Sequence, residues 1–224
     1  TKHWHHFSIA PSCQPATSQF SVLNSFPAAV LIHAHKLNHR PFSTRILHPL
    51  LFFILLAGDI ELNPGPTFNI CTLNVRSLTN SLHKASVFDL ATCTHPDIFA
   101  LTETWIRPTT TNSELADATP PGYSLISQQR NTDSNNIGGG LAFLVREPFI
   151  TASSPSASFS TFESLSVTFQ LCSSKLTIFN IYRPPTTSKF TGTFSTFLSE
   201  FESFLSSVVS LPHDFIITGD FNIH

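Results

Sequence analysis

The stretch Asp214-Phe-Ile-Ile-Thr-Gly-Asp220-Phe-Asn222-Ile-His224 is an apolar run that ends on a carboxylate and an amide. Residues 215–218 are the β-branched and aromatic types that are typical of a strand buried on both faces. Gly219 allows a tight turn, and Asp220 and Asn222, two positions apart on an extended segment, point to the same side. The stretch therefore predicts a buried strand whose end presents two polar side chains.

Two interpretations fit the end of this strand. In open α/β sheets, catalytic groups gather at the carboxyl ends of strands. A carboxylate beside an amide suits a metal-assisted hydrolysis, in which one group orients or deprotonates a water and the other holds an oxyanion. The alternative is an ordinary Asx-rich turn after a buried strand. The ends of the other predicted strands decide between the two.

Length and composition limit the possible classes. The chain has 224 residues, 41% of them hydrophobic, which is enough for one domain with a real core plus an additional segment. Its formal charge of −2 gives no global basic field, so nucleic-acid binding would need a local patch. The cysteines show no short paired spacing, and buried free thiols in a reducing compartment are expected. Because the sequence lacks methionine, we expect that the true start lies upstream.

The first 57 residues differ in character from the rest. Residues 1–66 hold seven of the eleven histidines, with scattered prolines and little periodicity, and we expect residues 1–57 to form a poorly structured leader. His3, His5 and His6 lack Cys or carboxylate partners at ligand spacing, which argues against a metal tract. The apolar run at 50–57 is too short for a membrane span of about 20 residues. Its length also fits a signal-peptide core, so secretion stays as an alternative.

Residues 58–66, Gly-Asp-Ile-Glu-Leu-Asn-Pro-Gly-Pro, follow this run. Local propensity predicts a turn, because Asn-Pro and Pro-Gly are turn dipeptides. The segment from Asp59 to Pro66 also resembles the 2A-like ribosome-skipping peptides of viruses and some retrotransposons. That resemblance implies that the bond between Gly65 and Pro66 is skipped on the ribosome, so that the downstream protein begins at Pro66 and the leader is a separate product.

From Thr67 onward the apolar pattern becomes regular. Residues 68–75 and Ile98–Thr102 predict strands on either side of a helix at 82–94. Further strand candidates, separated by turn residues and able to pair as antiparallel neighbours, lie at 123–127, 141–145, 165–169 and 176–182. Surface loops are expected at 128–140 and 153–160.

The clearest element is an amphipathic helix just before the final strand. Its apolar side chains follow the i, i+3, i+4, i+7 pattern: Phe194, Phe197, Leu198, Phe201, Phe204, Leu205 and Val208. We interpret this aromatic stripe as core packing and not as a ligand-binding surface.

Polar side chains end four of the predicted strands. They are Asn74, Glu103, Asn180 with Tyr182 and Arg183, and Asp220 with Asn222. Each alone is more often an ordinary strand end, but neighbouring strand ends would bring them to one rim. A carboxylate with amides suits a Mg²⁺ ion that keeps several waters and binds substrate phosphate. Tyr182 can donate a hydrogen bond to that phosphate, and Arg183 can supply a local positive charge.

Six short motifs occur in a fixed order along residues 67–224. They are Leu-Asn74-Val-Arg-Ser-Leu, Thr-Glu103-Thr-Trp, Gly138-Gly-Gly-Leu-Ala-Phe-Leu-Val-Arg146, Glu163-Ser-Leu, Ile-Tyr182-Arg-Pro-Pro and Gly-Asp220-Phe-Asn222. Together they resemble the endonuclease/exonuclease/phosphatase superfamily, and most closely the endonuclease domain of non-LTR (LINE-type) retrotransposons. The resemblance implies an α/β fold, a two-sheet sandwich with outer helices. It also implies a Mg²⁺-dependent (or Mn²⁺-dependent) enzyme that nicks one DNA strand, leaving a 3′-hydroxyl primer for a reverse transcriptase downstream in the same polyprotein.

The resemblance also implies roles for the polar strand ends. Glu103 would hold the metal with help from Asn74, and Tyr182, with Asn180 in the same catalytic group, would act at the scissile phosphate. Asp220 would orient or deprotonate the attacking water. Asn222 would steady the phosphate and Asp220. Arg183 and Asn74 would bind substrate.

Two departures from the family pattern matter. Arg76 stands where DNA-repair relatives carry an aspartate, which favours the retrotransposon branch. The family's closing Ser/Thr-containing strand and its final Asp-His pair lie beyond Gly-Asp-Phe-Asn, and we interpret His224 as a neighbour and not as that histidine. We therefore expect a C-terminally incomplete sandwich with unpaired strand edges, inactive and poorly soluble as a 224-residue chain.

Two alternatives stay open. The same fold could act on a phosphoinositide, sphingolipid or nucleotide, or the chain could be a non-catalytic relic or binding module. Thr-Glu-Thr-Trp and Tyr-Arg-Pro-Pro favour the retrotransposon enzyme over the first alternative. The resemblance implies an intracellular protein, nuclear or cytoplasmic, although no basic localisation run is present.

Overall fold

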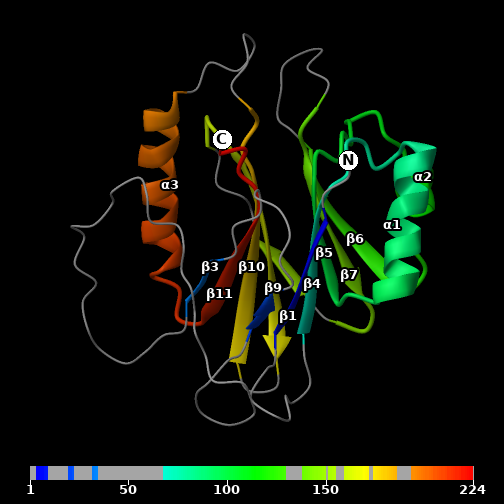
Figure 1. Cartoon of the computed structure of the whole chain (residues 1–224), viewed down its shortest axis with the longest axis horizontal. Helices are drawn as coiled ribbons and strands as arrows, with labels where there is room; N and C mark the ends of the chain where they lie inside the picture. Colours follow the sequence, from blue (N-terminus) through cyan, green and yellow to red (C-terminus); the bar gives the residue numbers. More distant parts are fainter. Residues whose placement is uncertain are drawn as a thin grey trace.

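The computed structural model describes most of the chain after residue 67 and three short strands before it. The described parts are Trp4–Ile9, Phe20–Val22, Ile32–Ala34 and residues 68–129, 138–149, 151–154, 159–171, 174–185 and 193–223. Two mixed β-sheets pack face to face, and helices lie on their outer surfaces (Figure 1). This arrangement confirms the predicted two-sheet α/β sandwich with outer helices.

The first sheet has six strands. In spatial order they are β2 (Phe20–Val22), β1 (Trp4–Ile9), β4 (Phe68–Asn74), β5 (Ile98–Thr102), β7 (Leu141–Arg146) and β6 (Tyr123–Gln128). β4 and β5 are parallel, with Asn74 opposite Thr102. All five residues of β5 are buried, as the β-branched and apolar composition of that strand requires for a central strand covered on both faces.

The second sheet has five strands. In spatial order they are β3 (Ile32–Ala34), β11 (Asp214–Asp220), β10 (Ser174–Tyr182), β9 (Glu163–Leu171) and β8 (Thr151–Ser154). β10 and β11 are parallel, with Tyr182 opposite Asp220, whereas β9 pairs with β10 in the antiparallel direction. Each sheet therefore contains one parallel pair, and the two pairs end at the same end of the sandwich, the upper end in Figure 1.

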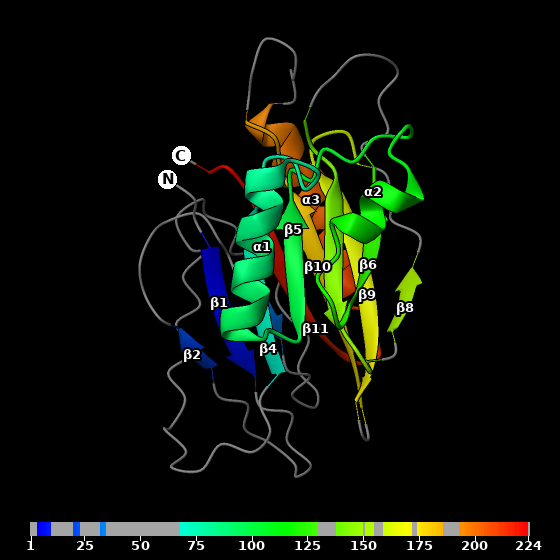
Figure 2. The ribbon, with the colours of Figure 1, turned by 90° about the vertical axis from the view of Figure 1, so that its right-hand side faces the viewer.

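Helices cover the outer faces of both sheets. α1 (Ser81–Thr94) and α2 (Asn112–Asp117) lie on the first sheet, and α3 (Phe194–Val208) lies on the second (Figures 1 and 2). Asn80 caps α1 by accepting from the amides of Leu82 and His83. None of the helices in the described ranges is both long and apolar enough to cross a membrane.

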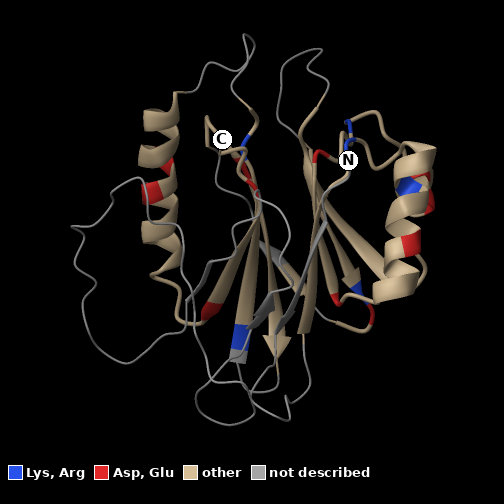
Figure 3. Ribbon diagram, viewed as in Figure 1, with Lys and Arg blue, Asp and Glu red and all other residues tan. Residues whose placement is uncertain are grey.

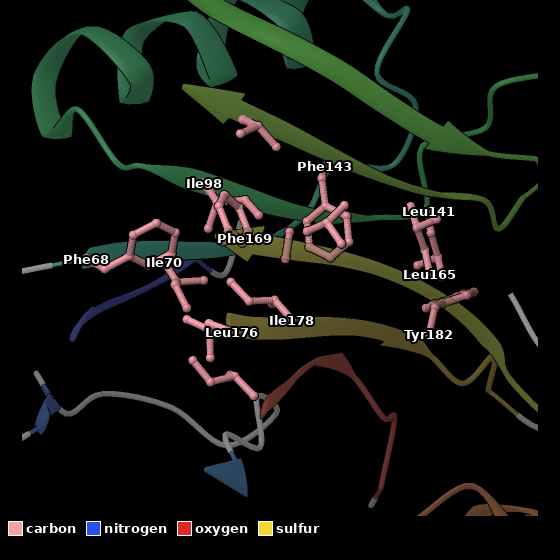
Figure 4. Close-up of a cluster of buried hydrophobic side chains, with 14 residues drawn as sticks. Phe68, Ile70, Ile98, Leu141, Phe143, Leu165, Phe169, Leu176, Ile178 and Tyr182 are labelled. Carbon is pink, nitrogen blue, oxygen red and sulfur yellow. The ribbon is translucent and has the colours of Figure 1, made fainter. Parts of the chain in front are cut away.

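The core forms three apolar layers. The central layer lies between the sheets, where the labelled side chains run from Phe68 at one end to Leu165 and Tyr182 at the other (Figure 4). Val87 and Ala91 of α1 pack on the outer face of the first sheet, and the aromatic stripe of α3 packs on the outer face of the second. Charged residues are sparse on the strands and lie mainly on the helices, in loops and near strand ends (Figure 3). Phe197, Phe201, Phe204 and Val208 of the stripe on α3 are core packing, as predicted, whereas Phe194 and Leu198 are exposed.

Several elements differ from the sequence-based expectation. The predicted strands at 123–127 and 141–145 pair with each other as β6 and β7, and those at 165–169 and 176–182 pair as β9 and β10, but the two pairs belong to different sheets. Two elements were not predicted from the sequence. They are α2 and β8, and β8 extends into the Ser-rich stretch predicted as a loop at 153–160.

Three short strands lie within the predicted leader, residues 1–57. β1 pairs with β4 and β3 pairs with β11, so one edge of each of these two strands carries a strand from residues 1–57. The rest of residues 1–67, including the predicted skipping site at Gly65 and Pro66, lies outside the described residues.

Candidate active site at the carboxyl ends of the parallel strands

The predicted polar strand ends meet across the two sheets. Asn74 ends β4 in the first sheet, and its side-chain nitrogen donates to Glu103 Oε1 at 2.9 Å and to Asp220 Oδ2, at the end of β11 in the second sheet, at 2.9 Å. The Tyr182 hydroxyl at the end of β10 donates to Glu103 Oε1 at 3.0 Å. The rim expected from the sequence therefore exists, but it is built from two facing sheets and not from neighbours within one sheet.

Strand alternation explains why these side chains face each other. Side chains two positions apart lie on the same face of a strand. The inner faces of β4, β10 and β11 carry Thr72 with Asn74, Asn180 with Tyr182, and Thr218 with Asp220, respectively. The Thr72 and Thr218 hydroxyls are hydrogen-bonded at 2.6 Å, and Asn180 Nδ2 donates across the interface to Leu101 O at 2.9 Å and to Ala142 O at 3.3 Å. These buried polar bonds hold the sheets at a fixed spacing directly beneath the site.

The backbone after β5 turns sharply to present Glu103. Glu103 has a left-handed φ of +54°, and its carbonyl accepts from the Ser77 amide at 2.8 Å. The next amide, Thr104 N, donates to Gly140 O at 3.1 Å. A Cβ on Gly140 would lie 2.7 Å from Thr104 Oγ1, so only glycine fits this approach. The glycine-rich motif at 138–140 therefore supports the turn that carries Glu103.

Glu163 is a contributor that the sequence analysis left without a role. It begins β9 opposite Tyr182, and its Oε2 accepts from the Gly140 amide at 2.6 Å. This bond ties the glycine turn of the first sheet to the second sheet. The motif Glu163-Ser-Leu was a signal for it, but a side-chain bond to a distant glycine amide cannot be read from local sequence.

The turn after β11 fixes Asp220. Gly219 has a φ of +140°, and a Cβ at this position would lie 1.9 Å from Ile181 O, so the parallel pairing of β10 and β11 requires glycine. The Asn222 amide donates to Asp220 Oδ1 at 3.2 Å, and the Arg183 amide donates to Asp220 O at 2.9 Å. The Asx-type turn that was the alternative interpretation is present, and it orients the carboxylate that Asn74 contacts.

The donor set fits a divalent cation. Asn74 Oδ1 is buried and has no hydrogen-bond partner among the described residues, although the nitrogen of the same amide bonds both carboxylates. No Lys or Arg forms an ion pair with Glu103 or Asp220 in the described part of the chain. The same part of the chain holds no group of three or more His, Cys, Asp or Glu suited to a metal. Two carboxylates and an amide oxygen are hard ligands of the kind Mg²⁺ uses when it also keeps waters.

Two of the predicted site residues have other surroundings. Asn180 lies one layer below the rim and bonds backbone carbonyls of the first sheet. Arg183 is only 6% exposed, and its Nη1 donates to Phe221 O at 3.3 Å and to Asn222 O at 2.9 Å. The Asn222 amide nitrogen of the side chain donates in return to Arg183 O at 2.7 Å. His224 lies outside the described residues.

Fold and site together define an α/β sandwich with an acidic, amide-bridged site of the kind used in metal-assisted hydrolysis. Residues 67–224, more than half of the chain, match the Endonuclease/Exonuclease/phosphatase family. The chain belongs to this family, whose members are generally hydrolytic nucleases or phosphodiesterases. No curated protein sequence matches the chain.

Solved structures are similar at low sequence identity. A humanized D. rerio TDP2 shares 14% identity at a TM-score of 0.50, over 69% of this chain and 66% of that one. The AP endonuclease LMAP from Leishmania major shares 16% identity at a TM-score of 0.49, over 68% and 54%. The endonuclease domain of TRAS1, a telomere-specific non-LTR retrotransposon, shares 12% identity at a TM-score of 0.47, over 69% and 59%. The chain thus spans less than two thirds of the length of each of these structures.

Proposed function

We propose that this chain carries the active site of a divalent-cation-dependent phosphodiesterase that nicks one strand of DNA. The observation that carries the proposal is the Asn74 amide. Its nitrogen joins Glu103 of its own sheet to Asp220 of the other, and its oxygen is buried without a partner within the described residues. A buried acceptor beside two carboxylates needs a positive partner, and a hydrated cation satisfies all three groups at once.

Glu103 and Asn74 would hold the Mg²⁺ or Mn²⁺ ion. When bound, the ion would supply Lewis-acid stabilisation of the charge that develops on the phosphate. The Tyr182 hydroxyl, which donates to Glu103 Oε1, keeps the metal-facing carboxylate in one orientation. As a neutral donor at the rim, this hydroxyl would also be able to donate to a phosphate oxygen of the substrate.

Asp220 would act on the attacking water. Its Oδ1 accepts from the Asn222 amide and its Oδ2 accepts from Asn74, so the carboxylate is held in place from two sides. A fixed carboxylate can orient a water for in-line attack and accept its proton at a free lone pair. The Asn222 side chain bonds the carbonyl of Arg183, which makes the turn around Asp220 rigid before substrate arrives.

The DNA substrate is supported by the ordered motifs, above all Thr-Glu103-Thr-Trp and Tyr182-Arg-Pro-Pro. We place the enzyme in a retrotransposon polyprotein that acts in the nucleus, where the nick provides a primer for a downstream reverse transcriptase. Ribosome skipping between Gly65 and Pro66 would separate the leader from this enzyme during synthesis.

A plasmid-nicking assay tests the function. The assay uses the protein translated from its whole open reading frame, because the family resemblance implies a further Asp-His pair after Asn222. We expect conversion of supercoiled plasmid to open circles that requires Mg²⁺ or Mn²⁺, and a rate about 10³-fold lower for Asp220→Ala, since a positioned general base contributes on that order.

The matched control is Asp214→Ala, which removes a carboxylate from the opposite end of the same strand. It should nick like the wild type. Nicking that survives in Asp220→Ala would contradict the assignment of Asp220. Hydrolysis of a phosphoinositide or nucleotide without DNA nicking would replace the substrate class, and no hydrolysis of any of these would favour a non-catalytic binding module.

A further inference from the structure

Arg183 is a buried cation whose contacts point inward and not toward the open rim. It follows β10, is 94% buried, and its guanidinium lies 4.8 Å from the ring centre of Phe197 and 5.4 Å from that of Phe194, both at the start of α3. Burial lowers the pKa of Arg183, yet a guanidinium keeps its charge at any physiological pH. A permanently charged group in this position must be satisfied by fixed partners.

Those partners lie mainly in the backbone of residues 220–222, the turn that follows β11. Arg183 Nη1 donates to the carbonyls of Phe221 and Asn222, while the Arg183 amide and carbonyl bond Asp220 O and the Asn222 side chain. Four hydrogen bonds therefore connect Arg183, the residue after β10, to three consecutive residues that begin with the last residue of β11. No carboxylate forms an ion pair with Arg183 in the described ranges.

The contacts form a continuous path from α3 to the carboxylate. The guanidinium contacts the rings of Phe194 and Phe197. It also donates hydrogen bonds to the Phe221 and Asn222 carbonyls. The Asn222 amide in turn donates to Asp220 Oδ1. Phe194 is 43% exposed, and its ring lies 5.4 Å from the guanidinium. Covering the cation accounts for its position, because aromatic faces attract a guanidinium.

We propose that Arg183 is a positioning residue that fixes the orientation of the Asp220 carboxylate through Asn222, and that the amino-terminal turn of α3 is part of this device. The expected effect of Arg183 on catalysis rests on the proposed function. Its effect on the orientation of the Asp220 carboxylate does not. A positioning role for Arg183 differs from direct substrate binding, because Nη1 is already engaged with two carbonyls and the guanidinium lies against two rings.

The first test measures hydrogen exchange of the Asn222 and Arg183 amides in the full chain, and it needs no activity. Arg183→Met keeps the apolar packing and removes the donors. We expect both amides to exchange at least about 10-fold faster, while amides in the middle of β11 keep their protection. Arg183→Lys should restore part of the protection, because an ammonium can bond one carbonyl but cannot stack on the rings. Unchanged exchange in Arg183→Met would overturn the inference.

The second test separates positioning from phosphate contact. When DNA nicking is measured with the protein translated from the whole open reading frame, Arg183→Met should lower kcat about 10-fold or more and leave KM unchanged. The salt dependence of DNA binding should also stay as in the wild type. A residue that contacts phosphate would instead raise KM and reduce the slope of log affinity against log salt by about 0.9. That second pattern would overturn the inference.

Two further variants test the contribution of the aromatic contact and of positive charge alone. Phe194→Leu, at a position that is 43% exposed, should shift exchange and kcat in the same direction as Arg183→Met but less. Lys175→Met removes a positive charge from the other end of β10 and should change neither quantity. If the wild type neither binds a cation nor nicks DNA, the proposed function fails, whereas the exchange result still decides the role of Arg183.

Discussion

The two ends of the sandwich treat their acidic side chains in opposite ways. At the amino end of β5, Asp97 is 2% exposed, forms an ion pair with Arg146 and accepts from the Asn69 amide at 2.7 Å. At the carboxyl end, Glu103 and Asp220 receive hydrogen bonds from an amide and have no cationic partner in the described part of the chain. The carboxylate at the first end thus has a cationic partner from the protein, whereas the two carboxylates at the second end have only neutral donors among the described residues.

Neighbouring groups strengthen this contrast. At the Asp97 end, burial raises the pKa of Tyr123 to about 12, with Arg146 acting in the opposite direction, so the hydroxyl keeps its proton and donates to Pro96 O at 2.7 Å. At the other end, the Asn74 oxygen is left without a donor among the described residues. This contrast supports the proposal that the Asn74, Glu103 and Asp220 cluster is the functional site.

The largest expected effect on stability is at Gly219. Gly219→Ala would place a methyl group 1.9 Å from Ile181 O at a φ of +140°, so we expect a loss of at least about 3 kcal/mol in the free energy of unfolding. Gly122→Ala is the matched control, because Gly122 has a φ of +79° and no atom within 4 Å of the added carbon. It should cost about 1 kcal/mol. Urea unfolding of both variants measures this, and equal losses would mean that the close approach at the site end is not rigid.

The second prediction compares the two kinds of carboxylate directly. Asp97→Asn removes the charge that pairs with Arg146, and because that arginine is 42% exposed we expect a loss of about 2 kcal/mol, below the range for a fully buried pair. Glu103→Gln removes a carboxylate that faces another acid without a cation, so the free energy of unfolding should change by less than about 0.5 kcal/mol. A larger loss for Glu103→Gln than for Asp97→Asn would reverse the comparison of the two ends.

The smallest effect concerns a satisfied carboxylate near the functional end. Glu200 of α3 accepts from the amides and hydroxyls of Ser160 and Thr161, at 2.5 to 3.0 Å. Partial burial raises its pKa, but these hydrogen bonds outweigh it and hold the pKa below the ordinary value of 4.5. A depressed pKa in the folded state gives stability that is present above pH 4.5 and is lost as the pH falls through the folded value.

Glu200→Gln should therefore be less stable than the wild type by less than about 1 kcal/mol at pH 7, and the difference should vanish below the folded pKa. Thermal unfolding between pH 3 and pH 7 measures it. Glu202→Gln, on the exposed face of the same helix, is the control for loss of charge alone. A difference that does not depend on pH would exclude the carboxylate as its source.

Local pattern was enough to predict most of the fold. The run at Asp214–Asp220 and the apolar stripe of Phe194–Val208 match β11 and α3 residue for residue, because their periodicities are strong and their ends are marked by polar residues or proline. α2 was missed although Thr111 and Glu114 form a capping box with a visible sequence signal. β8 was missed because a short Ser-rich edge strand has little β-propensity of its own.

The sequence could predict which polar residues come together at the candidate site, but not how the two sheets bring them together. Strand ends indicated that Asn74, Glu103, Tyr182 and Asp220 would meet. The sequence could not show that they meet across two sheets, since that depends on which faces pack together and not on local pattern. For the same reason local pattern could not show the surroundings of Arg183, which are set by the first turn of α3, a part of the chain that joins the site only in three dimensions; its role in substrate binding stays a prediction.

The most direct test of the proposed cation site is to measure Mn²⁺ binding to the full chain by electron paramagnetic resonance. The measurement compares the wild type, Glu103→Gln and Asp97→Asn. We predict one site in the wild type, at least about 10-fold weaker binding in Glu103→Gln, and wild-type binding in Asp97→Asn as far as the variant is folded. Equal binding by the wild type and Glu103→Gln, or no binding by the wild type, would contradict the conclusion that the Asn74, Glu103 and Asp220 cluster is a cation site.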